Sequence, residues 1–367
     1  MRVAIIGGGQ LGRMLGEAAH PLGVAVRFLD PGDAPCARTA GPVTQGRFDD
    51  LAALEALAAW ADVVTYEFEN VPVDAVAAIR GAPVYPPPGA LRVAQDRLTE
   101  KTFFRDLGID VAPFAPVDDL AGLRAAVGVL GRPSLLKTRR FGYDGKGQSR
   151  FGDRGTPGDL EAAWEQVGGV PCVLEGFVPF DRELSILAAR RPSGEVRCWP
   201  LVENEHRAGV LHRSVSPASA DAPLQRQAES IVRHAMEALD YVGVLTIELF
   251  DVGGQLVVNE MAPRVHNSGH GTIEGSVTSQ FENHLRAVLD LPLGDTDAVQ
   301  PWGMRNLLGA EPPLAELLAL SGVRVHRYDK APRPGRKVGH VTVLGPTAEA
   351  RGERLGAVER LIEAHRA

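Results

Sequence analysis

A short apolar run at the N-terminus leads directly into a turn of glycines, and this junction constrains the fold more than any other part of the chain. Residues 2–6 predict a buried parallel strand, residues 13–22 predict a helix, and a second strand ends at Asp30. The turn between them, Gly7 to Gly12, has the spacing Gly-x-Gly-x-x-Gly. We therefore expect an N-terminal β-α-β unit of the Rossmann type.

The sequence does not decide which ligand binds at this turn. Glycines at the start of a helix let the backbone approach a phosphate group. With Asp30 closing the next strand, the pattern matches the dinucleotide fingerprint of a nicotinamide-dependent oxidoreductase. A phosphorylated substrate would explain the same turn equally well.

The composition is that of an ordinary globular protein, with 367 residues of which 44% are hydrophobic and 23% are charged. The net charge of -7 argues against nucleic acid as the main partner, because proteins that bind the phosphate backbone normally carry a basic face. Cys36, Cys172 and Cys198 show no C-x-x-C spacing, which argues against a disulfide framework and favours the cytoplasm. No apolar stretch approaches the length of about 18 residues that a membrane-spanning helix requires.

Breaks in the pattern predict three domains. We place the first domain at 1–110, a small β-rich lid at 111–180, and a larger domain at 181–367 that includes a small β-unit at about 301–348. Beyond the first unit, we expect strands at 62–66, 134–137, 149–151, 172–177, 184–189, 196–200, 244–250 and 256–261, and helices at 51–60, 73–80, 96–107, 224–239 and 276–289.

Lysine is rare in the chain, and all five lysines lie in short blocks rich in Gly, Arg, Asp or His, at Lys101, Lys137, Lys146, Lys330 and Lys337. Because an ammonium group meets a phosphate as a compact point charge, we interpret these lysines as candidate anion sites. Lys137 ends an apolar strand, and the glycine-rich hairpin that follows it could fold over a polyphosphate. The segment from Lys330 to Lys337 holds four cations in eight residues and suits a phosphate cup.

Two carboxylates, Glu248 and Glu260, lie in neighbouring predicted strands joined by a tight turn. If Phe250 pairs with Leu256, Glu248 lies opposite Val258, and Glu260 lies diagonally on the same face, about 7 Å away. Magnesium typically uses one or two carboxylates and takes its other oxygens from water and phosphates, so this pair predicts a magnesium site. A slip of one residue would place the two acids on opposite faces and remove the site.

Hydrogen-bond donors follow directly after the strand of Glu260. Four of these residues could clamp an anion beside the metal, where charge develops if a phosphoryl group is transferred: Arg264, His266, Asn267 and Ser268. The two histidines of this segment, His266 and His270, lack the spacing of a Cys/His metal site.

Five blocks of the chain together resemble one family, at residues 7–14, 137–148, 175–185, 259–270 and 328–340. They resemble the N5-carboxyaminoimidazole ribonucleotide synthetases, which are ATP-grasp ligases of purine synthesis. The resemblance implies an α/β and α+β ATP-grasp fold, with an N-terminal Rossmann-like pre-ATP-grasp domain, a small lid domain and a C-terminal catalytic domain. It also implies a homodimer.

The resemblance implies a set of residues for each ligand, and several residues serve more than one. The residues expected to contact ATP are Arg97, Lys137, Gly142, Tyr143, Asp144, Gly145, Lys146, Gly147, Gln148, Glu175, Gly176, Phe177, Val178, Glu183, His206, Asn259 and Glu260. Those expected to surround the ribonucleotide and bicarbonate are Gln10, Tyr143, Asp144, Lys146, Arg264, His266, Asn267, Ser268, Lys330, Arg336 and Lys337. The expected catalytic residues are Asp144, Lys146, Arg264, His266 and Asn267, and Glu248 and Glu260 would hold Mg2+, with Mn2+ as the alternative ion. The choice between Glu67 and Glu69 as a substrate contact stays open.

The implied reaction begins when bicarbonate attacks the γ-phosphate of ATP and forms carboxyphosphate. The exocyclic amine of 5-aminoimidazole ribonucleotide then captures the carboxyl group, or CO2 released from it, and we hypothesise that Asp144 accepts the amine proton. Because carboxyphosphate is short-lived in water, the reaction requires a site closed by the lid. The rival functions are a formate-using transformylase or carboxylate–amine ligase of the same fold, a nicotinamide-dependent oxidoreductase and a non-catalytic nucleotide sensor.

Overall fold

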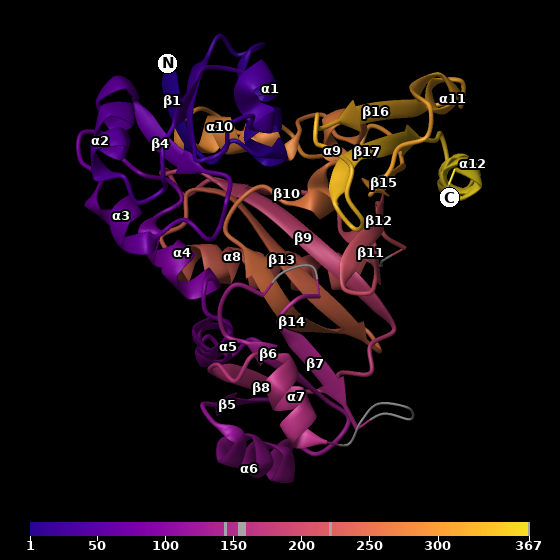
Figure 1. Cartoon of the computed structure of the whole chain (residues 1–367). Helices are drawn as coiled ribbons and strands as arrows, with labels where there is room; N and C mark the ends of the chain where they lie inside the picture. The colour runs from indigo at the N-terminus through magenta and orange to yellow at the C-terminus, as the bar shows by residue number, and fades with distance from the viewer. Residues whose placement is uncertain (143–144, 153–158, 220–221, 366–367) are drawn as a thin grey trace.

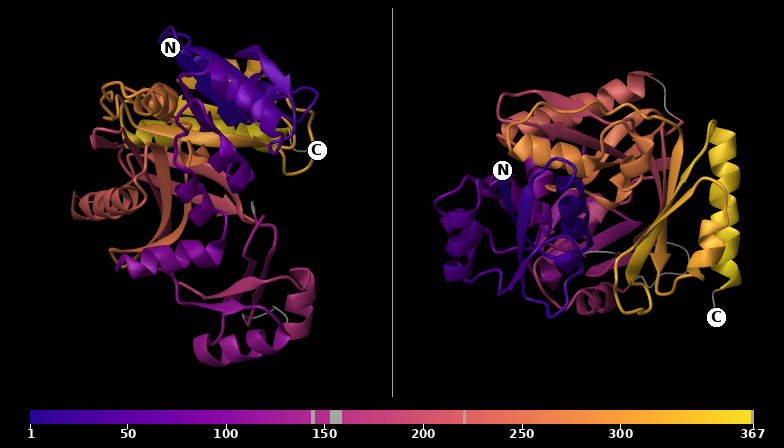
Figure 2. Two further views of the ribbon diagram at one scale, coloured as in Figure 1. Left: turned by 90° about the vertical axis from the view of Figure 1, so that its left-hand side faces the viewer. Right: turned by 90° about the horizontal axis from the view of Figure 1, so that it is seen from above.

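The structure is a computed structural model that describes residues 1–142, 145–152, 159–219 and 222–365. The described strands form three sheets. In Figure 1 the N-terminal sheet lies at the upper left, a long sheet runs through the centre, and a small sheet with its helices lies at the bottom. Figure 2 shows that this small unit stands away from the rest of the molecule. Within the described ranges, no helix is long and apolar enough to cross a membrane.

The N-terminal sheet is parallel, with strand order β3-β2-β1-β4. Its elements are β1 (Arg2–Ile6), α1 (Gln10–Ala19), β2 (Ala25–Asp30), a 3-10 helix (Cys36–Thr39), β3 (Val43–Gln45), α2 (Leu51–Trp60), β4 (Val63–Tyr66) and α3 (Val73–Ala78). The predicted β-α-β unit is confirmed, but helix α1 begins at Gln10, three residues earlier than expected. It begins there because Gly9 is already the N-cap residue, and its carbonyl oxygen accepts from the Arg13 amide.

Two helices, α4 (Pro88–Ala94) and α5 (Arg97–Asp106), lead from this sheet to the small unit. The predicted helix at 96–107 is confirmed as α5, because Asp96 caps it by accepting from the amides of Leu98 and Thr99. The small unit has an antiparallel sheet of order β5-β8-β6-β7. Its elements are β5 (Phe114–Val117), α6 (Leu120–Leu130), β6 (Ser134–Thr138), β7 (Gln148–Phe151), α7 (Leu160–Gln166) and β8 (Cys172–Gly176).

The long sheet has strand order β14-β13-β9-β11-β12-β15-β17-β16, with β10 paired to β9. Its strands are β9 (Arg182–Arg190), β10 (Val196–Cys198), β11 (Val202–Arg207), β12 (Val210–Ser216), β13 (Gly243–Val252), β14 (Gln255–Ala262), β15 (Trp302–Leu308), β16 (Val323–Arg327) and β17 (Lys337–Leu344). The expected strands at 184–189, 196–200, 244–250 and 256–261 are confirmed, whereas the β11–β12 hairpin was not expected. This hairpin joins β9 to β15, so the C-terminal strands continue the long sheet.

The helices around the long sheet are α8 (Ala222–Ala238), α9 (Thr272–Gly275), α10 (Gln280–Val288), α11 (Leu314–Leu318) and α12 (Ala348–Ala364), with a 3-10 helix at Asn267–Gly269. The helix expected at 276–289 begins only at Gln280, because Ser279 caps it by accepting from the Glu282 amide. Buried His284 on α10 joins two sheets, since its Nδ1 accepts from the Val244 amide at 3.1 Å and its Nε2 lies 2.8 Å from Thr65 Oγ1 on β4. Burial lowers the pKa of His284 to about 4, so the ring is neutral and its Nε2 donates to the hydroxyl.

Candidate active site

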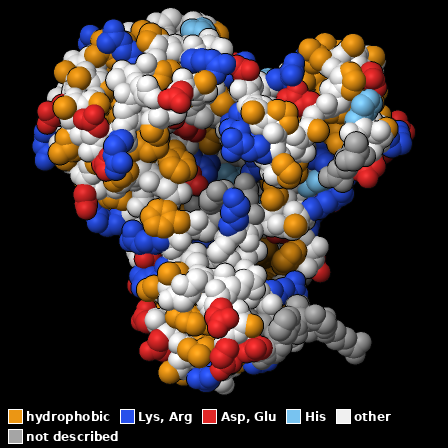
Figure 3. Space-filling model, in the orientation of Figure 1, with side chains coloured by type: hydrophobic (Ala, Val, Ile, Leu, Met, Phe, Trp, Pro, Cys, Tyr) orange, Lys and Arg blue, Asp and Glu red, His pale blue; other side chains and the backbone are white. Residues whose placement is uncertain are grey.

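A cavity of about 620 Å3 lies where the sheet of the small unit, the long sheet and the N-terminal domain meet, so the small unit occupies the place of the expected lid. Figure 3 shows the recess between the two upper lobes and the lid, with Lys and Arg side chains around it. The predicted site residues that line this cavity are Gln10, Arg97, Lys137, Gly142, Gly145, Lys146, Gln148, Glu175, Gly176, Phe177, Val178, Glu183, His206, Glu248, Asn259, Glu260, Arg264, His266, Asn267 and Lys337. Residues far apart in the sequence therefore come together as one site.

Some predicted site residues are not part of the cavity wall. Ser268 is fully buried, and its hydroxyl lies 2.9 Å from His266 Nδ1, so it supports the histidine from behind. Lys330 donates to the Gln10 side chain, and Arg336 folds back on the Ala331 carbonyl oxygen at 3.1 Å. Gly147 packs against Thr138. Tyr143 and Asp144 lie outside the described residues.

Glu248 and Glu260 face each other directly across β13 and β14, but not in the expected register. Asp251 pairs with Leu256, one residue away from the predicted pairing of Phe250 with Leu256. That shift alone would have sent the two acids to opposite faces. A β-bulge between Glu248 and Leu249 inserts Asn259 into β14 and restores both acids to one face. The predicted diagonal geometry is wrong, and the predicted shared face is confirmed.

The two acids have very different environments. Burial raises the pKa of Glu248 to about 7, with the charge of Glu260 adding to the effect. Burial alone would also raise the pKa of Glu260, but the charges of Arg97 and Lys137 hold it at about 2. Arg97 Nη1 lies 2.6 Å from Glu260 Oε2, and its other arm donates to the Gly142 carbonyl oxygen at 3.3 Å. Two opposed carboxylates in one cavity are a donor set that suits a divalent cation.

Lys137 lies on the lid side of the cavity, where β6 and β8 pair. Its ammonium group is 2.9 Å from Glu175 Oε2, and both side chains are buried. Burial lowers the pKa of Lys137 despite the nearby glutamate. Burial would raise the pKa of Glu175, yet Lys137, Lys101 and Arg97 together hold it at about 2. Lys101 does not border the cavity and is buried beside Glu175, so its interpretation as a candidate anion site stays a prediction.

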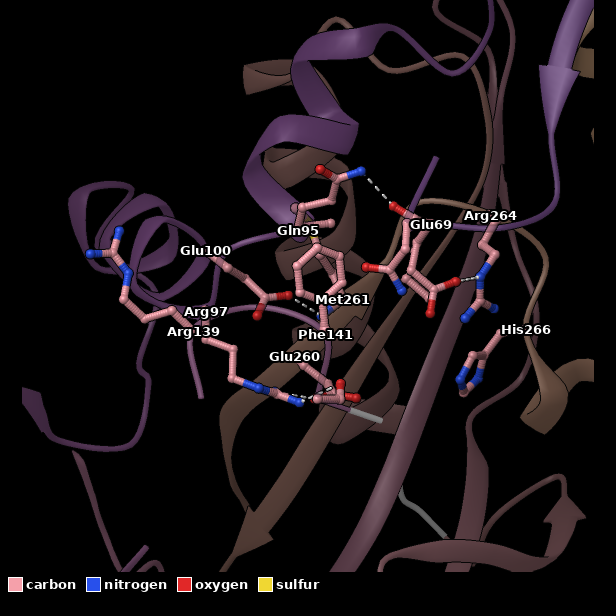
Figure 4. Close-up of a pocket in the computed structure, with 14 residues that line it drawn as sticks. Glu69, Gln95, Arg97, Glu100, Arg139, Phe141, Glu260, Met261, Arg264 and His266 are labelled. Carbon is pink, nitrogen blue, oxygen red and sulfur yellow. Dashed lines mark hydrogen bonds and ion pairs between the residues drawn. The ribbon is translucent and has the colours of Figure 1, made fainter. Parts of the chain in front are cut away.

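A small side chamber of about 80 Å3 adjoins the cavity on the side of α4 and α5. Figure 4 shows that Arg264 pairs with Glu69 on one side of this chamber and that Arg97 reaches Glu260 on the other. Glu69 and Arg264 line both spaces, which makes Glu69 rather than Glu67 the acid that borders the cavity.

The backbone amides of the glycine turn in the N-terminal domain donate hydrogen bonds to two carboxylates of the same chain. The Gly8 amide donates to Asp30 at 2.7 Å, and the Gly9 amide donates to Glu67 at 2.7 Å. Gly7 has a φ of +105°, and a Cβ at this position would lie 2.7 Å from Glu67 Oε1. The amides of Gly8 and Gly9 therefore already have hydrogen-bond partners, and Asp30 accepts from the turn instead of facing a ribose. This geometry does not support a dinucleotide site at the turn.

Apolar and aromatic side chains complete the cavity, and sequence reasoning missed most of them. Phe180 and Phe250 stack at 4.6 Å between ring centroids, and both line the cavity. Phe250 could have been found, because it lies two residues from Glu248 on one face of the same strand. Ala208 and Gly209 were missed because the β11–β12 hairpin was not predicted. Other cavity residues not predicted are Leu11, Ala112, Leu135, Arg150 and Leu211.

Three family models match the chain in succession. The ribonucleotide synthetase preATP-grasp domain matches residues 1–95, the ATP-grasp domain matches residues 102–281, and the phosphoribosylaminoimidazole carboxylase C-terminal domain matches residues 303–354. These models follow the chain order of the N-terminal sheet, the lid with the first part of the long sheet, and the C-terminal strands.

Similar proteins cover almost the whole chain. The N5-carboxyaminoimidazole ribonucleotide synthase of Pseudomonas aeruginosa is 49% identical over 365 residues, which are 99% of this chain and 100% of the relative. The crystal structure of N5-carboxyaminoimidazole ribonucleotide synthetase from Thermus thermophilus matches with a TM-score of 0.93 and 52% identity, covering 98% of both chains. The N5-carboxyaminoimidazole synthase of Aspergillus clavatus, in complex with ADP and 5-aminoimidazole ribonucleotide, matches with a TM-score of 0.90 and 31% identity, covering 99% of this chain and 98% of the other.

Proposed function

The chain belongs to the N5-carboxyaminoimidazole ribonucleotide synthase family of ATP-grasp ligases, and we propose how its residues carry out the reaction of that family. The chain is an ATP-dependent carbon–nitrogen ligase of purine biosynthesis, which carboxylates 5-aminoimidazole ribonucleotide to N5-carboxyaminoimidazole ribonucleotide. One observation supports this mechanism above all: a single cavity is lined by Lys137, by the Glu248–Glu260 pair and by residues of the segment 264–267.

The first step is phosphoryl transfer. An oxygen of bicarbonate attacks the γ-phosphorus of ATP, the bond to the β-phosphate oxygen breaks, and ADP leaves carboxyphosphate behind. Lys137 neutralises charge on the transferring group once its ammonium group turns from Glu175 into the cavity. Glu248 and Glu260 would hold Mg2+, or Mn2+ in its place, whose role when bound is to neutralise phosphate charge. Magnesium typically uses one or two carboxylates and takes its remaining ligands from phosphate and water.

The second step forms the new bond from nitrogen to carbon. The exocyclic amine attacks the carboxyl carbon of carboxyphosphate, inorganic phosphate leaves, and the amine loses one proton. Asn267 is suited to hold these reactants, because its side-chain oxygen and nitrogen are buried and have no hydrogen-bond partner among the described residues. We propose that it acts with Arg264 and His266 on bicarbonate and the imidazole ring, and that Gln10 and Lys337, which also line the cavity, hold the sugar phosphate. Asp144 remains the proposed proton acceptor, and an Asp144→Asn enzyme with unchanged turnover would rule it out.

We also propose an oligomeric state and a cellular location for the enzyme. We propose a homodimer, which light scattering coupled to gel filtration would test directly. We also propose that it works in the cytoplasm, where Cys36, Cys172 and Cys198 would stay reduced, as they are in the structure.

Phosphate release tests the function. The purified protein receives ATP and Mg2+, and bicarbonate and 5-aminoimidazole ribonucleotide are added separately and together. We expect rapid release, with N5-carboxyaminoimidazole ribonucleotide formed, only when both are present. Formate replacing bicarbonate tests the transformylase alternative, and release that depends on formate rather than on bicarbonate would overturn the proposal.

A further inference from the structure

A second buried lysine stands behind the wall of the cavity. Lys101 lies on α5, is 1% exposed, and does not line the cavity. Its ammonium group is 3.2 Å from Glu175 Oε1, while that of Lys137 is 2.9 Å from Glu175 Oε2. One buried carboxylate is therefore shared by two ammonium groups, of which only Lys137 reaches the cavity.

This arrangement matters because a buried charge without a partner is costly. Lys137 lines the cavity, so a phosphate bound there would compete with Glu175 for its ammonium group. If Lys137 were the sole partner of Glu175, its departure would leave a carboxylate that is 3% exposed without a counter-charge. Lys101 removes this cost, since it stays on the carboxylate while Lys137 moves.

Lys101 also reaches the strand of Glu260. Its ammonium group donates to the Asn259 carbonyl oxygen at 3.3 Å. Asn259 is the extra residue of the β-bulge that brings Glu248 and Glu260 to one face. A single side chain on α5 thus connects Glu175 on β8 to the bulge on β14.

We propose that Lys101 is a positioning residue for the nucleotide, which keeps Glu175 neutralised so that Lys137 is free to bind phosphate. It does not touch ATP. The inference rests on the proposed function, because it assumes that a nucleotide polyphosphate occupies the cavity. It goes beyond that function by assigning a role to a residue outside the cavity wall.

A double-mutant cycle tests the role of Lys101. Titration calorimetry measures the Kd of ADP, with Mg2+ present, for the wild type, Lys101→Met, Glu175→Gln and the double variant. We expect Lys101→Met to raise the Kd about tenfold or more in the wild-type background and less than about threefold in the Glu175→Gln background, because an amide needs no counter-charge. The KM for 5-aminoimidazole ribonucleotide should stay within about twofold for Lys101→Met, since Lys101 acts on the nucleotide alone. Equal losses of ADP affinity in the two backgrounds would overturn the proposal.

Two further measurements keep the test decisive. Arg105→Met, on the exposed part of the same helix, is the matched control and should bind ADP as the wild type does. If Lys101→Met does not fold, the double variant decides: it should fold and bind ADP as Glu175→Gln does, and an unfolded double variant overturns the proposal. A wild type that does not bind ADP contradicts the proposed function itself, whereas a wild type that binds but shows no coupling contradicts only the role of Lys101.

Discussion

The glycine turn of the N-terminal domain and the wall of the cavity both bring charged groups to a place where a phosphate would fit, yet they differ in what is left for a ligand. In the turn, the amides of Gly8 and Gly9 already donate to Asp30 and Glu67. In the wall, by contrast, the Asn259 side-chain oxygen and both polar atoms of the Asn267 side chain have no partner among the described residues.

The difference shows that a glycine pattern predicts that some group will lie close to the backbone, but does not tell whether that group belongs to a ligand or to the protein. In the turn the approaching group belongs to the chain, so substitutions there should act on stability. In the cavity wall the approaching group must come from outside, so substitutions there should act on catalysis. Substitutions in the cavity wall and in the turn test the two sides of this division.

Glu248→Gln should give the largest effect, with opposite signs for activity and stability. Turnover should fall about 1000-fold, because the metal would lose one of its two carboxylates. The free energy of unfolding at pH 8 should rise by about 1–3 kcal/mol, because burial and Glu260 both disfavour the charge of Glu248. ADP formation at saturating Mg2+ and urea denaturation measure the two effects. Glu161→Gln on the surface is the control, and turnover of Glu248→Gln within tenfold of the wild type would contradict the assignment.

Lys137→Met should lower kcat/KM for ATP about 100- to 1000-fold, because one charge that stabilises the transferring phosphoryl group is lost. The Kd for 5-aminoimidazole ribonucleotide should change less than about threefold, and the fold should persist because Lys101 still neutralises Glu175. Steady-state kinetics and titration calorimetry separate the two substrates. Equal losses for both would show that Lys137 supports the site as a whole rather than the nucleotide.

Most of the fold could be predicted from local pattern, because the apolar runs and caps that define the elements lie within a few residues of one another. The N-terminal β-α-β unit and the strands of Lys137, Glu248 and Glu260 follow from such signals. The β11–β12 hairpin escaped prediction, because residues 203–207 are all polar or charged, and Val202 alone gives no apolar alternation.

The site was harder to predict where it depends on distant contacts. The prediction that Glu248 and Glu260 share one face assumed the wrong strand register. The two acids do share a face, but only because a β-bulge inserts Asn259 into β14. The contact between Gly9 and Glu67 joins residues 58 positions apart, and the pair of Lys101 with Glu175 crosses from α5 to β8. A local sequence pattern cannot predict which carboxylate will contact an amide or an ammonium group that lies so far away in the sequence.

Gly7→Ala should destabilise the protein by about 3 kcal/mol while leaving catalysis almost intact. A Cβ at Gly7 would lie 2.7 Å from Glu67 Oε1, and the φ of +105° is strained for any L-residue. Urea denaturation measures the loss, and kcat/KM for ATP well below the melting temperature should stay within about threefold. Gly89→Ala is the control, because a Cβ there meets nothing within 4 Å; since Gly89 lies in helix α4, the alanine should stabilise the protein by up to about 1 kcal/mol. A selective loss of ATP affinity in Gly7→Ala would instead place the turn in the nucleotide site.

Glu67→Gln should change how stability depends on pH, by about 2 kcal/mol between pH 5 and pH 7. Burial raises the pKa of Glu67 from 4.5 to about 7, and the Gly9 amide and Arg264 oppose this rise only in part. The folded state therefore binds more protons than the unfolded state between these pH values, so the contribution of Glu67 to stability is full below about pH 4.5 and is lost as the pH rises through 7.

Glu100 and Glu248 also have raised pKa values, so the informative quantity is the difference between the wild type and the variant rather than either curve alone. Urea denaturation at pH 5, 6 and 7 measures it. The wild type should lose about 2 kcal/mol more than Glu67→Gln over this range, because a glutamine accepts from the Gly9 amide without titrating. Parallel curves would mean that Glu67 stays ionised throughout. The turn would then hold two full negative charges at Asp30 and Glu67, and its closure would rest on charge-assisted hydrogen bonds rather than on a neutral acid.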